Sequence, residues 1–272
     1  MTFSIVARDG DAYGVAVASK FLAVGAAVPA AAVGVGALAT QAYANLAYRA
    51  DGLALLRAGR SASDVVTELT GADEGRDTRQ LGIVGPDAGA TFTGTGTSAW
   101  AGGRAGADYA VQGNILVGEA VVEALEQSWT SASNLPLAER LVAALQAGDE
   151  AGGDRRGRQS AALLVVRPGG GYGGDDTEVD LRVDDHSDPV PELARLLALQ
   201  RLYFGETDES ALLDLTGETA DEVRRLLGGL GFDQPDLAVA LDKWAGVANF
   251  EERLRPGRLD PVVLEQLRAG VT

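Results

Sequence analysis

The sequence contains no cysteine, and histidine occurs once, at His186. Without cysteine the chain forms neither a disulfide framework nor a cysteine-based metal site, and one histidine excludes a His-rich zinc site within one chain. Lysine is almost as scarce, because Lys20 and Lys243 are the only two in 272 residues. Any chemistry that needs an ammonium group therefore depends on very few side chains.

Positive charge is scarce relative to negative charge: 39 acidic residues oppose 23 Lys and Arg, giving a net charge of −16. A chain of this charge repels phosphate backbones and anionic membrane surfaces, so we predict no nucleic-acid partner and no membrane partner. The uncharged stretch 21–48 is interrupted by glycine and proline, which favours two buried strands around a turn over a membrane helix. No basic leader segment follows Met1, so we expect a cytoplasmic protein.

The apolar fraction of 46% is ample for a core, and its periodicity changes along the chain. Clustered strand patterns alternate with pairs of helical patterns, which predicts mostly antiparallel sheets with helices outside them. The expected strands are 3–7, 13–19, 33–40, 81–84, 90–93, 109–114, 161–166 and 179–183, and the expected helices are 51–58, 61–69, 118–129, 135–147 and 191–204. Helix signals dominate from residue 205 onward. We therefore predict a domain over 1–204 and a small all-α domain over 205–272.

One stretch, 152–186, concentrates polar residues around two expected strands. Asp154 lies on a Gly-punctuated loop with three arginines, and Gln159 and Ser160 lead directly into the first strand. The acidic cluster at the ends of the second strand consists of Asp175, Asp176, Asp184 and Asp185, with His186 next to it. Its oxygen-rich character would suit Mg²⁺ or Ca²⁺, although adjacent aspartates more often form solvated loop ends, so we predict no metal site.

Candidate nucleophiles lie on the first expected strand. Thr2 and Ser4 are two residues apart, so they share one face of that strand. Lys20 ends the second strand of the same hairpin, where a partly desolvated ammonium group lowers a neighbour's pKa or acts as a base once neutral. A hydroxyl on a strand is otherwise only packed or hydrogen-bonded.

Several segments together resemble one family. FSIVARD, GVAVASKFLAVG, GVGALATQAYAN, YAVQGN, GDRRGRQSAALLVV, GGYGGDD and DLRVDDH occur in an order similar to that of the DUF1028 family, whose fold is that of the N-terminal nucleophile (Ntn) hydrolases. The resemblance covers about residues 1–200 and implies an α+β fold, a four-layer αββα sandwich. Residues 221–227, 249–254 and 259–267 resemble the peptidoglycan-binding domains appended to this family.

The resemblance also implies site residues. The nucleophile would be Ser4 or Thr2, with Lys20 and Asp154 in support. An amide of Thr40 or Gln41 would stabilise the oxyanion, and Asn114, Gln159 and Ser160 would line the substrate pocket. Ntn hydrolases use the free amine of the nucleophilic residue as base, so an intact Met1 would remove this mechanism from Thr2. In that case Lys20 would have to serve as base for Ser4. Counted back along the hairpin from Gly14, Ser4 fits the family's nucleophile position better than Thr2 does.

Three functions remain open at this point. The first is hydrolysis of an amide or cyclic amide of a small molecule, without a cofactor, which we favour. The second is a non-catalytic module that binds a small ligand on the same scaffold. The third is a metal-dependent hydrolase that uses the acidic cluster with His186. A homodimer is kept open as a partner arrangement.

Overall fold

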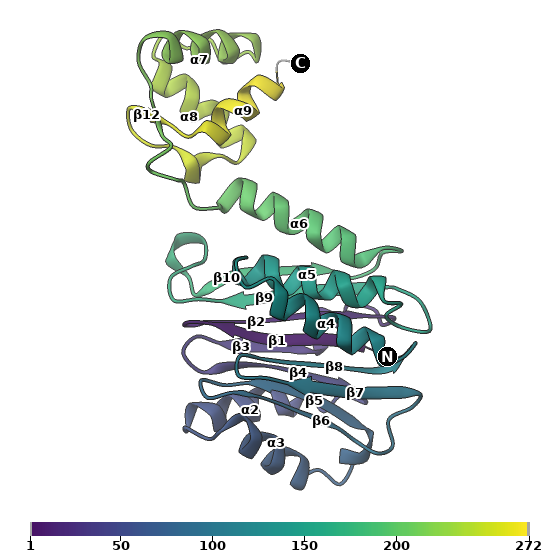
Figure 1. Ribbon diagram of the computed structural model, residues 1–272. Helices are drawn as coiled ribbons and strands as arrows, with labels where there is room; N and C mark the ends of the chain where they lie inside the picture. The colour runs from purple at the N-terminus through teal and green to yellow at the C-terminus, as the bar shows by residue number, and fades with distance from the viewer. Residues whose placement is uncertain (1, 271–272) are drawn as a thin grey trace. The chain divides into compact units, whose positions relative to one another are not determined.

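The computed structural model describes residues 2–270, and Figure 1 shows their arrangement. The chain splits into two compact units after Leu197. The domain boundary that we expect, after residue 204, stays a prediction. No helix within residues 2–270 is long and apolar enough to cross a membrane.

The first unit contains two antiparallel sheets. A six-stranded sheet has the order β10-β9-β2-β1-β8-β7, and a four-stranded sheet has the order β3-β4-β5-β6. The strands are β1 Thr2–Asp9, β2 Ala12–Ser19, β3 Pro29–Ala32, β4 Gly36–Ala42, β5 Arg79–Val84, β6 Gly89–Thr93, β7 Trp100–Ala105, β8 Tyr109–Leu116, β9 Ser160–Val166 and β10 Thr177–Val183. Neighbouring strands in both sheets run antiparallel, as the clustered strand patterns predict.

Helices cover the outer faces of both sheets (Figure 1). These helices are α2 Ala47–Arg57, α3 Ala62–Gly71, α4 Ala120–Ser131, α5 Leu137–Glu150 and α6 Pro189–Phe204, the last of which passes the division between the units. The short helix α1 Val24–Ala27 instead contributes Val24 to the core between the sheets. One apolar core joins α4 and α5 to the six-stranded sheet, a second fills the space between the sheets, and a third joins α2 and α3 to the four-stranded sheet. The interior is therefore layered, and a polar site between the sheets is enclosed on both sides.

The alternation of β1 decides which side chains enter the space between the sheets. Phe3 and Ile5 belong to the core beneath α4 and α5, whereas Val6 belongs to the core between the sheets. Because strand side chains alternate, Thr2 and Ser4 also face the second sheet. The prediction that these two hydroxyls share a face is confirmed by this arrangement.

Some elements agree with the expectations from local sequence patterns, and others differ from them. Ser61 caps α3 by accepting a hydrogen bond from the Asp64 amide, as the capping-box pattern predicts. The strand expected over 33–40 is found as β4, which begins three residues later, and its pairing with β3 forms the two strands around a turn expected within 21–48. Strand β7 is absent from the expected strands, because Gly102 and Gly103 lower its apparent strand propensity, yet pairing with β8 holds it in the sheet.

The second unit is mainly helical, as predicted, with α7 Gly217–Gly229, α8 Leu237–Ala248 and α9 Pro261–Gly270 around one apolar core. Two-residue strands, β11 Leu213–Asp214 and β12 Arg258–Leu259, pair beside the helices. Thr216 occupies the N-cap position of α7.

Candidate functional site

A row of polar side chains crosses four strands at one end of the six-stranded sheet. Thr2 pairs with Asn114 on β8 and with Ser19 on β2, and Ser19 pairs with Ser160 on β9. The Thr2 and Ser19 hydroxyl oxygens are 3.1 Å apart. All four residues are buried, although the sheet interior around them is mostly apolar. Antiparallel register thus brings together residues up to 158 positions apart.

This polar row lies beside a cavity of about 400 Å³. Thr2 and Asn114 line its polar end, and Phe21, Val24 and Val28 contribute an apolar wall. Gln41 reaches the same cavity from the four-stranded sheet. The volume lies near the lower limit for small-molecule sites, which supports a compact ligand.

Backbone strain gathers around this cavity. Ala42 and Ile115 line it and have φ values of 65° and 51°. Ala23 and Ala99, next in sequence to lining residues, have φ values of 52° and 56°. A left-handed conformation is unusual for alanine and a genuine outlier for β-branched isoleucine. Because such strain persists only where the surrounding structure imposes it and clusters at functional sites, it marks this cavity as the candidate site.

Ser4 lies one step deeper and does not reach the cavity. Its side chain is fully buried at 0% exposure. The Ser4 hydroxyl donates to Gln41 Oε1 at 2.7 Å and accepts from Gln112 Nε2 at 2.6 Å. Gln80 extends this buried network, accepting from Gln41 Nε2 at 2.7 Å and from Asn114 Nδ2 at 2.9 Å. The network pairs the Ser4 hydroxyl with the Gln41 and Gln112 side chains and Gln80 Oε1 with the Gln41 and Asn114 amides, between the sheets where an unpaired polar group costs several kcal/mol.

Close packing of the two sheets makes this network depend on one glycine. A Cβ atom on Gly82 would lie 2.0 Å from Gln112 Oε1 and 2.4 Å from Gln112 Cδ. The glycine therefore gives the Gln112 amide room to reach Ser4. Gln112 Oε1 itself has no hydrogen-bond partner within the described part of the chain, where the amide is held through its nitrogen.

Lys20 does not lie beside Ser4, as the role of base for Ser4 would require. The Lys20 side chain is exposed, and its Nζ donates to the Arg158 carbonyl at 3.2 Å. Lys20 follows Ser19 at the end of β2, so it continues past the polar row instead of returning toward Ser4. The predicted placement is wrong because Ser4 pairs with Val17, three residues before Lys20.

Asp154 approaches the same strand end, but not as expected. Its carboxylate accepts from the backbone amides of Lys20 and Arg156, both at 2.8 Å, and does not hold the Lys20 ammonium. The Arg156 guanidinium lies 3.4 Å from the same carboxylate and lines the cavity. Positive φ values at Gly153 and Gly157 let the loop make this turn. Asp154 thus fixes the end of β2 and places Arg156.

The two oxyanion candidates differ in their backbone surroundings. The Thr40 amide donates to the Val28 carbonyl at 3.2 Å, so it does not point into the cavity as expected. The Thr40 hydroxyl donates to the Asn45 carbonyl. Gln41 lines the cavity, and its Nε2 donates to the Thr2 carbonyl at 3.3 Å. Of the pair, Gln41 is the residue that contacts Thr2.

The residues at the start of β9 separate into two environments. The Ser160 hydroxyl donates to the Phe21 carbonyl and accepts from the Val24 amide at 3.1 Å, so it supports the apolar wall from behind. Gln159 lies outside the cavity, where its Nε2 donates to Asp185 at 3.1 Å. Ser160 is therefore a structural support of the cavity, and Gln159 is not part of it.

The acidic cluster proposed as an alternative metal site does not form one group. Asp175 and Asp176 precede β10, whereas Asp184, Asp185 and His186 follow it. A strand of seven residues spans roughly 20 Å, which separates the two ends. Within residues 2–270 no three acidic or histidine side chains gather in a metal-binding arrangement. The metal-dependent alternative is therefore not supported.

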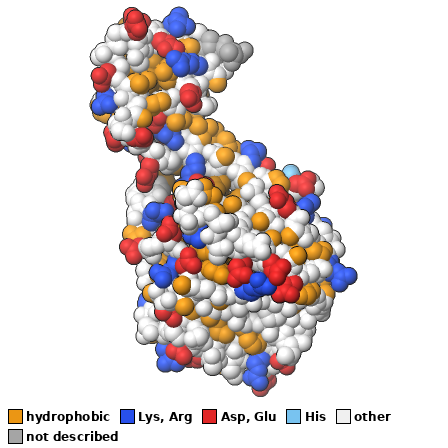
Figure 2. Space-filling view, viewed as in Figure 1, with side chains coloured by type: hydrophobic (Ala, Val, Ile, Leu, Met, Phe, Trp, Pro, Cys, Tyr) orange, Lys and Arg blue, Asp and Glu red, His pale blue; other side chains and the backbone are white. Residues whose placement is uncertain are grey.

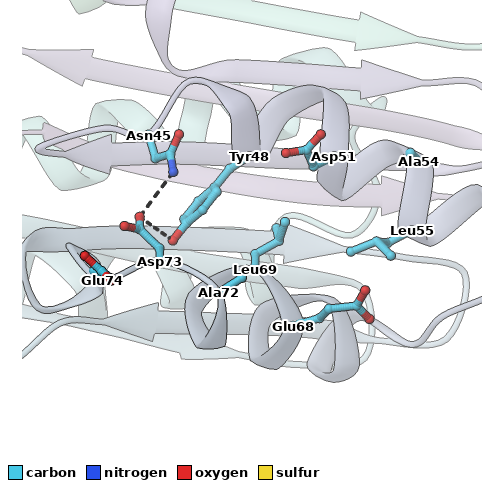
Figure 3. Close-up of a pocket in the computed structure, with 10 residues that line it drawn as sticks. All are labelled: Asn45, Tyr48, Asp51, Ala54, Leu55, Glu68, Leu69, Ala72, Asp73 and Glu74. Atoms are coloured by element: carbon cyan, nitrogen blue, oxygen red, sulfur yellow. Dashed lines mark hydrogen bonds between the residues drawn. The ribbon is translucent and has the colours of Figure 1, made fainter.

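A larger depression of about 740 Å³ lies between α2 and α3 (Figure 3). Four acidic side chains line it, including Asp73, whose carboxylate accepts hydrogen bonds from Tyr48 and Asn45. The Arg79 guanidinium, aided by these donors, holds the pKa of Asp73 well below its ordinary value. Burial and the bond to Asp73 raise the pKa of Tyr48. Asp73, Tyr48, Asn45 and Arg79 are thus held by one another, which gives this part of the depression a structural role.

Comparison with known proteins assigns the first unit. A family model described as "Family of unknown function (DUF1028)" matches residues 2–193. This chain belongs to the DUF1028 family. A second model, described as "Putative peptidoglycan binding domain", matches residues 203–267. The crystal structure of protein SPO2555 from Silicibacter pomeroyi, also DUF1028, is 32% identical with a TM-score of 0.66, covering 81% of this chain and 92% of that chain. No functionally curated protein matches.

The predicted family and the appended domain are confirmed by these matches. Four residues of the DUF1028 site region were missed in the sequence: Ser19, Gln80, Gln112 and Arg156. Ser19 could have been found by counting the hairpin register from Gly10, which pairs Thr2 with Ser19. The other three carried no such signal: Gln112 depends on the long-range pairing of β1 with β8, Arg156 on a loop, and Gln80 on how the two sheets face each other.

Proposed function

We propose that this DUF1028 protein hydrolyses an amide or cyclic amide of a small molecule, with Thr2 as nucleophile. The observation that carries the proposal is the position of Thr2. It starts β1, it is 5% exposed, and it lines the 400 Å³ cavity between two antiparallel sheets whose outer faces carry helices. The proposal interprets these layers as an Ntn hydrolase-like αββα sandwich, in which the nucleophile begins the first strand.

The geometry favours Thr2 over Ser4. Both hydroxyls face the second sheet, but only Thr2 borders the cavity. A ligand could reach Ser4 only after displacing the Gln41 and Gln112 amides, which bind its hydroxyl at 2.7 and 2.6 Å. A reacting group must be within hydrogen-bond reach of its partner before its pKa matters. Ser4 therefore belongs to the supporting structure.

The proposed reaction is acyl transfer through Thr2. Thr2 Oγ1 attacks the carbonyl carbon, the C–N bond breaks, and the amine leaves with the hydroxyl proton. The resulting ester on Thr2 is then hydrolysed by water, which gives a carboxylic acid and restores the hydroxyl. A threonine hydroxyl is a weak nucleophile without a base. In a chain without Met1, the Thr2 α-amine takes the proton and delivers it to the leaving amine.

The surroundings of Thr2 keep its backbone in place. Its carbonyl accepts from Gln41 Nε2 at 3.3 Å and from Asn114 Nδ2 at 3.5 Å. Its hydroxyl lies 3.1 Å from Ser19 Oγ. Because these groups come from three different strands, Thr2 is held by rigid elements, which is what a catalytic group needs for a fixed line of attack.

One observation favours a second candidate function, a module that binds its ligand without turnover. Lys20, the internal base expected for a chain that retains Met1, directs its Nζ to the Arg158 carbonyl and is not among the residues lining the cavity. Removal of Met1 would therefore favour hydrolysis, and retention of Met1 would favour the binding module. Met1 itself lies outside the described residues.

The test combines intact mass with turnover. Mass spectrometry of the purified protein establishes whether Met1 is removed. A panel of small N-acyl compounds and cyclic amides is then incubated with the wild type, Thr2→Ala, Thr2→Ser and Ser4→Ala, and released amines are quantified. We expect turnover to be lost in Thr2→Ala and partly retained in Thr2→Ser. Ser4→Ala should keep turnover while losing about 1 to 2 kcal/mol of stability.

Full turnover in Thr2→Ala would rule out Thr2 as nucleophile. Turnover lost in Ser4→Ala with an unchanged melting temperature would move the chemistry to Ser4. Binding of panel members without release of amine from the wild type would favour the binding module.

A further inference from the structure

The cavity is lined by a positively charged side chain, whereas the chain as a whole is strongly negative. The chain carries a net charge of −16, and acidic side chains lie scattered among basic ones over the face shown in Figure 2. Among the residues within 2–270 that line the 400 Å³ cavity, however, Arg156 is the one charged side chain. A small ligand that reaches this cavity therefore meets a guanidinium beside Thr2 and no carboxylate of the lining.

We infer that the ligand is a small amide that carries a carboxylate on one side of the amide bond and an apolar group on the other, an N-acyl amino acid in chemical class. This inference rests on the proposed function, since it names the substrate of the same cavity. Arg156 recognises the carboxylate, the apolar wall receives the acyl group, and the amide carbonyl lies at Thr2.

Arg156 is suited to a carboxylate by both its chemistry and its placement. A guanidinium has five N–H donors in a planar fork, so it binds a second carboxylate while keeping its contact with the first. That first partner is Asp154, at 3.4 Å, whose charge is already satisfied by the backbone amides of Lys20 and Arg156. The guanidinium is also half-exposed, which leaves it accessible to an incoming ligand.

Two exposed aromatic side chains that line the cavity indicate that the ligand has an apolar group. Phe21 and Tyr43 line the cavity and remain 55% and 76% exposed, which is unusual for side chains of this size. They come from the segments after β2 and β4, so they approach the cavity from different sheets. Aromatic and aliphatic walls with a few fixed polar groups are typical of small-molecule sites, where the polar groups set the orientation.

The second cavity provides a contrast within the same unit. The depression between α2 and α3 is lined by Asp51, Glu68, Asp73 and Glu74, a set that repels a carboxylate. The two cavities thus have opposite charge preferences. An anionic amide that binds this protein should therefore occupy the cavity at Thr2.

The experiment measures binding of matched ligands by calorimetry. The probes are N-benzoylglycine, its neutral primary amide, and N-acetylglycine, which lacks the large apolar group. They are titrated into the full chain as wild type, Arg156→Gln, Arg156→Lys and, as control, Arg155→Gln, which changes an exposed arginine that does not line the cavity. Thr2→Ala is included so that binding is measured without turnover.

We expect N-benzoylglycine to bind wild type and Thr2→Ala at least about tenfold more tightly than its neutral amide, as one charge-assisted contact provides. Arg156→Gln should abolish this preference, Arg156→Lys should keep part of it, and Arg155→Gln should keep all of it. N-acetylglycine should bind more weakly than N-benzoylglycine.

Equal affinity for the acid and its neutral amide in the wild type overturns the inference, and so does a preference that survives in Arg156→Gln. Failure of all three probes to bind at millimolar concentration also counts against it. The wild-type comparison decides the matter even if Arg156→Gln fails to fold. Carboxylate-dependent binding without release of amine would support the inferred ligand class and refute the proposed hydrolysis. Turnover of neutral amides alone would support hydrolysis and refute the inferred ligand class.

Discussion

Replacing Asp73 by asparagine should measure how strongly one carboxylate holds the segment after α3. Asp73 Oδ2 accepts from Arg79 Nε at 2.9 Å, the Tyr48 hydroxyl at 2.8 Å and Asn45 Nδ2 at 3.1 Å. Asp73 Oδ1 accepts from the Gly75 amide at 2.8 Å. Every partner is a donor, so either orientation of an asparagine amide places an NH₂ group against at least one donor.

The expected cost follows from burial and charge. The Asp73 and Arg79 side chains are 12% and 22% exposed. Breaking a buried ion pair by removing one partner costs about 3 to 5 kcal/mol, and the remaining solvent contact here favours the lower end. We therefore expect Asp73→Asn to lower the free energy of unfolding by about 3 kcal/mol at pH 7.

The effect should depend on pH in a defined direction. Because the pKa of Asp73 is lowered in the folded protein, chiefly by Arg79, its contribution is fully present above the unfolded pKa of about 4 and declines as pH falls. At pH 3 the unfolded carboxyl is mostly protonated while the folded one stays ionised. At pH 3 the free energies of unfolding of wild type and Asp73→Asn should therefore differ by about 1 kcal/mol less than at pH 7.

Urea unfolding followed by circular dichroism at pH 7 and pH 3 measures both quantities. Asp51→Asn is the matched control, since Asp51 lines the same depression but is exposed, and its change should stay within about 0.5 kcal/mol. A loss below 1 kcal/mol for Asp73→Asn, or a gap that widens at pH 3, would refute the reasoning.

Two further substitutions test the interior of each unit. Gly82→Ala should cost about 1 to 3 kcal/mol, because its Cβ would displace the Gln112 amide, and thermal unfolding would show it; an unchanged melting temperature would contradict the packing described. Arg253→Ala should cost the second unit about 3 to 5 kcal/mol, since it removes the guanidinium 2.8 Å from the buried Asp260 carboxylate and leaves that charge with neutral donors from Thr207 and Val262. Fluorescence of Trp244, the one tryptophan after residue 197, would report that loss, and a wild-type transition would contradict it.

Features that depend on neighbouring residues could be predicted from the sequence. Alternation along β1 placed Thr2 and Ser4 on one face, because successive strand residues point to opposite sides. The cap at Ser61 was readable for the same reason, since donor and acceptor lie three residues apart. The family was also evident from short segments that match in order.

Which of two equivalent hydroxyls borders the cavity was not readable locally. The answer depends on Gln41 and Gln112, which belong to other strands and close over Ser4. Lys20 was misplaced because its side chain follows the strand direction to the Arg158 carbonyl. The prominence of Asp154 in the sequence was a useful signal, but its partners turned out to be backbone amides.

The sequence by itself determined the antiparallel strands, the helical second unit, the shared face of Thr2 and Ser4 and the membership of the family. Only the tertiary structure decided that Thr2 meets Asn114, that Gln41 and Gln112 close over Ser4, and that Arg156 lines the cavity. The physical reason is the range of the interactions involved. Propensity, alternation and capping act within a few residues, whereas strand register and the packing of one sheet on another join side chains that are more than a hundred residues apart.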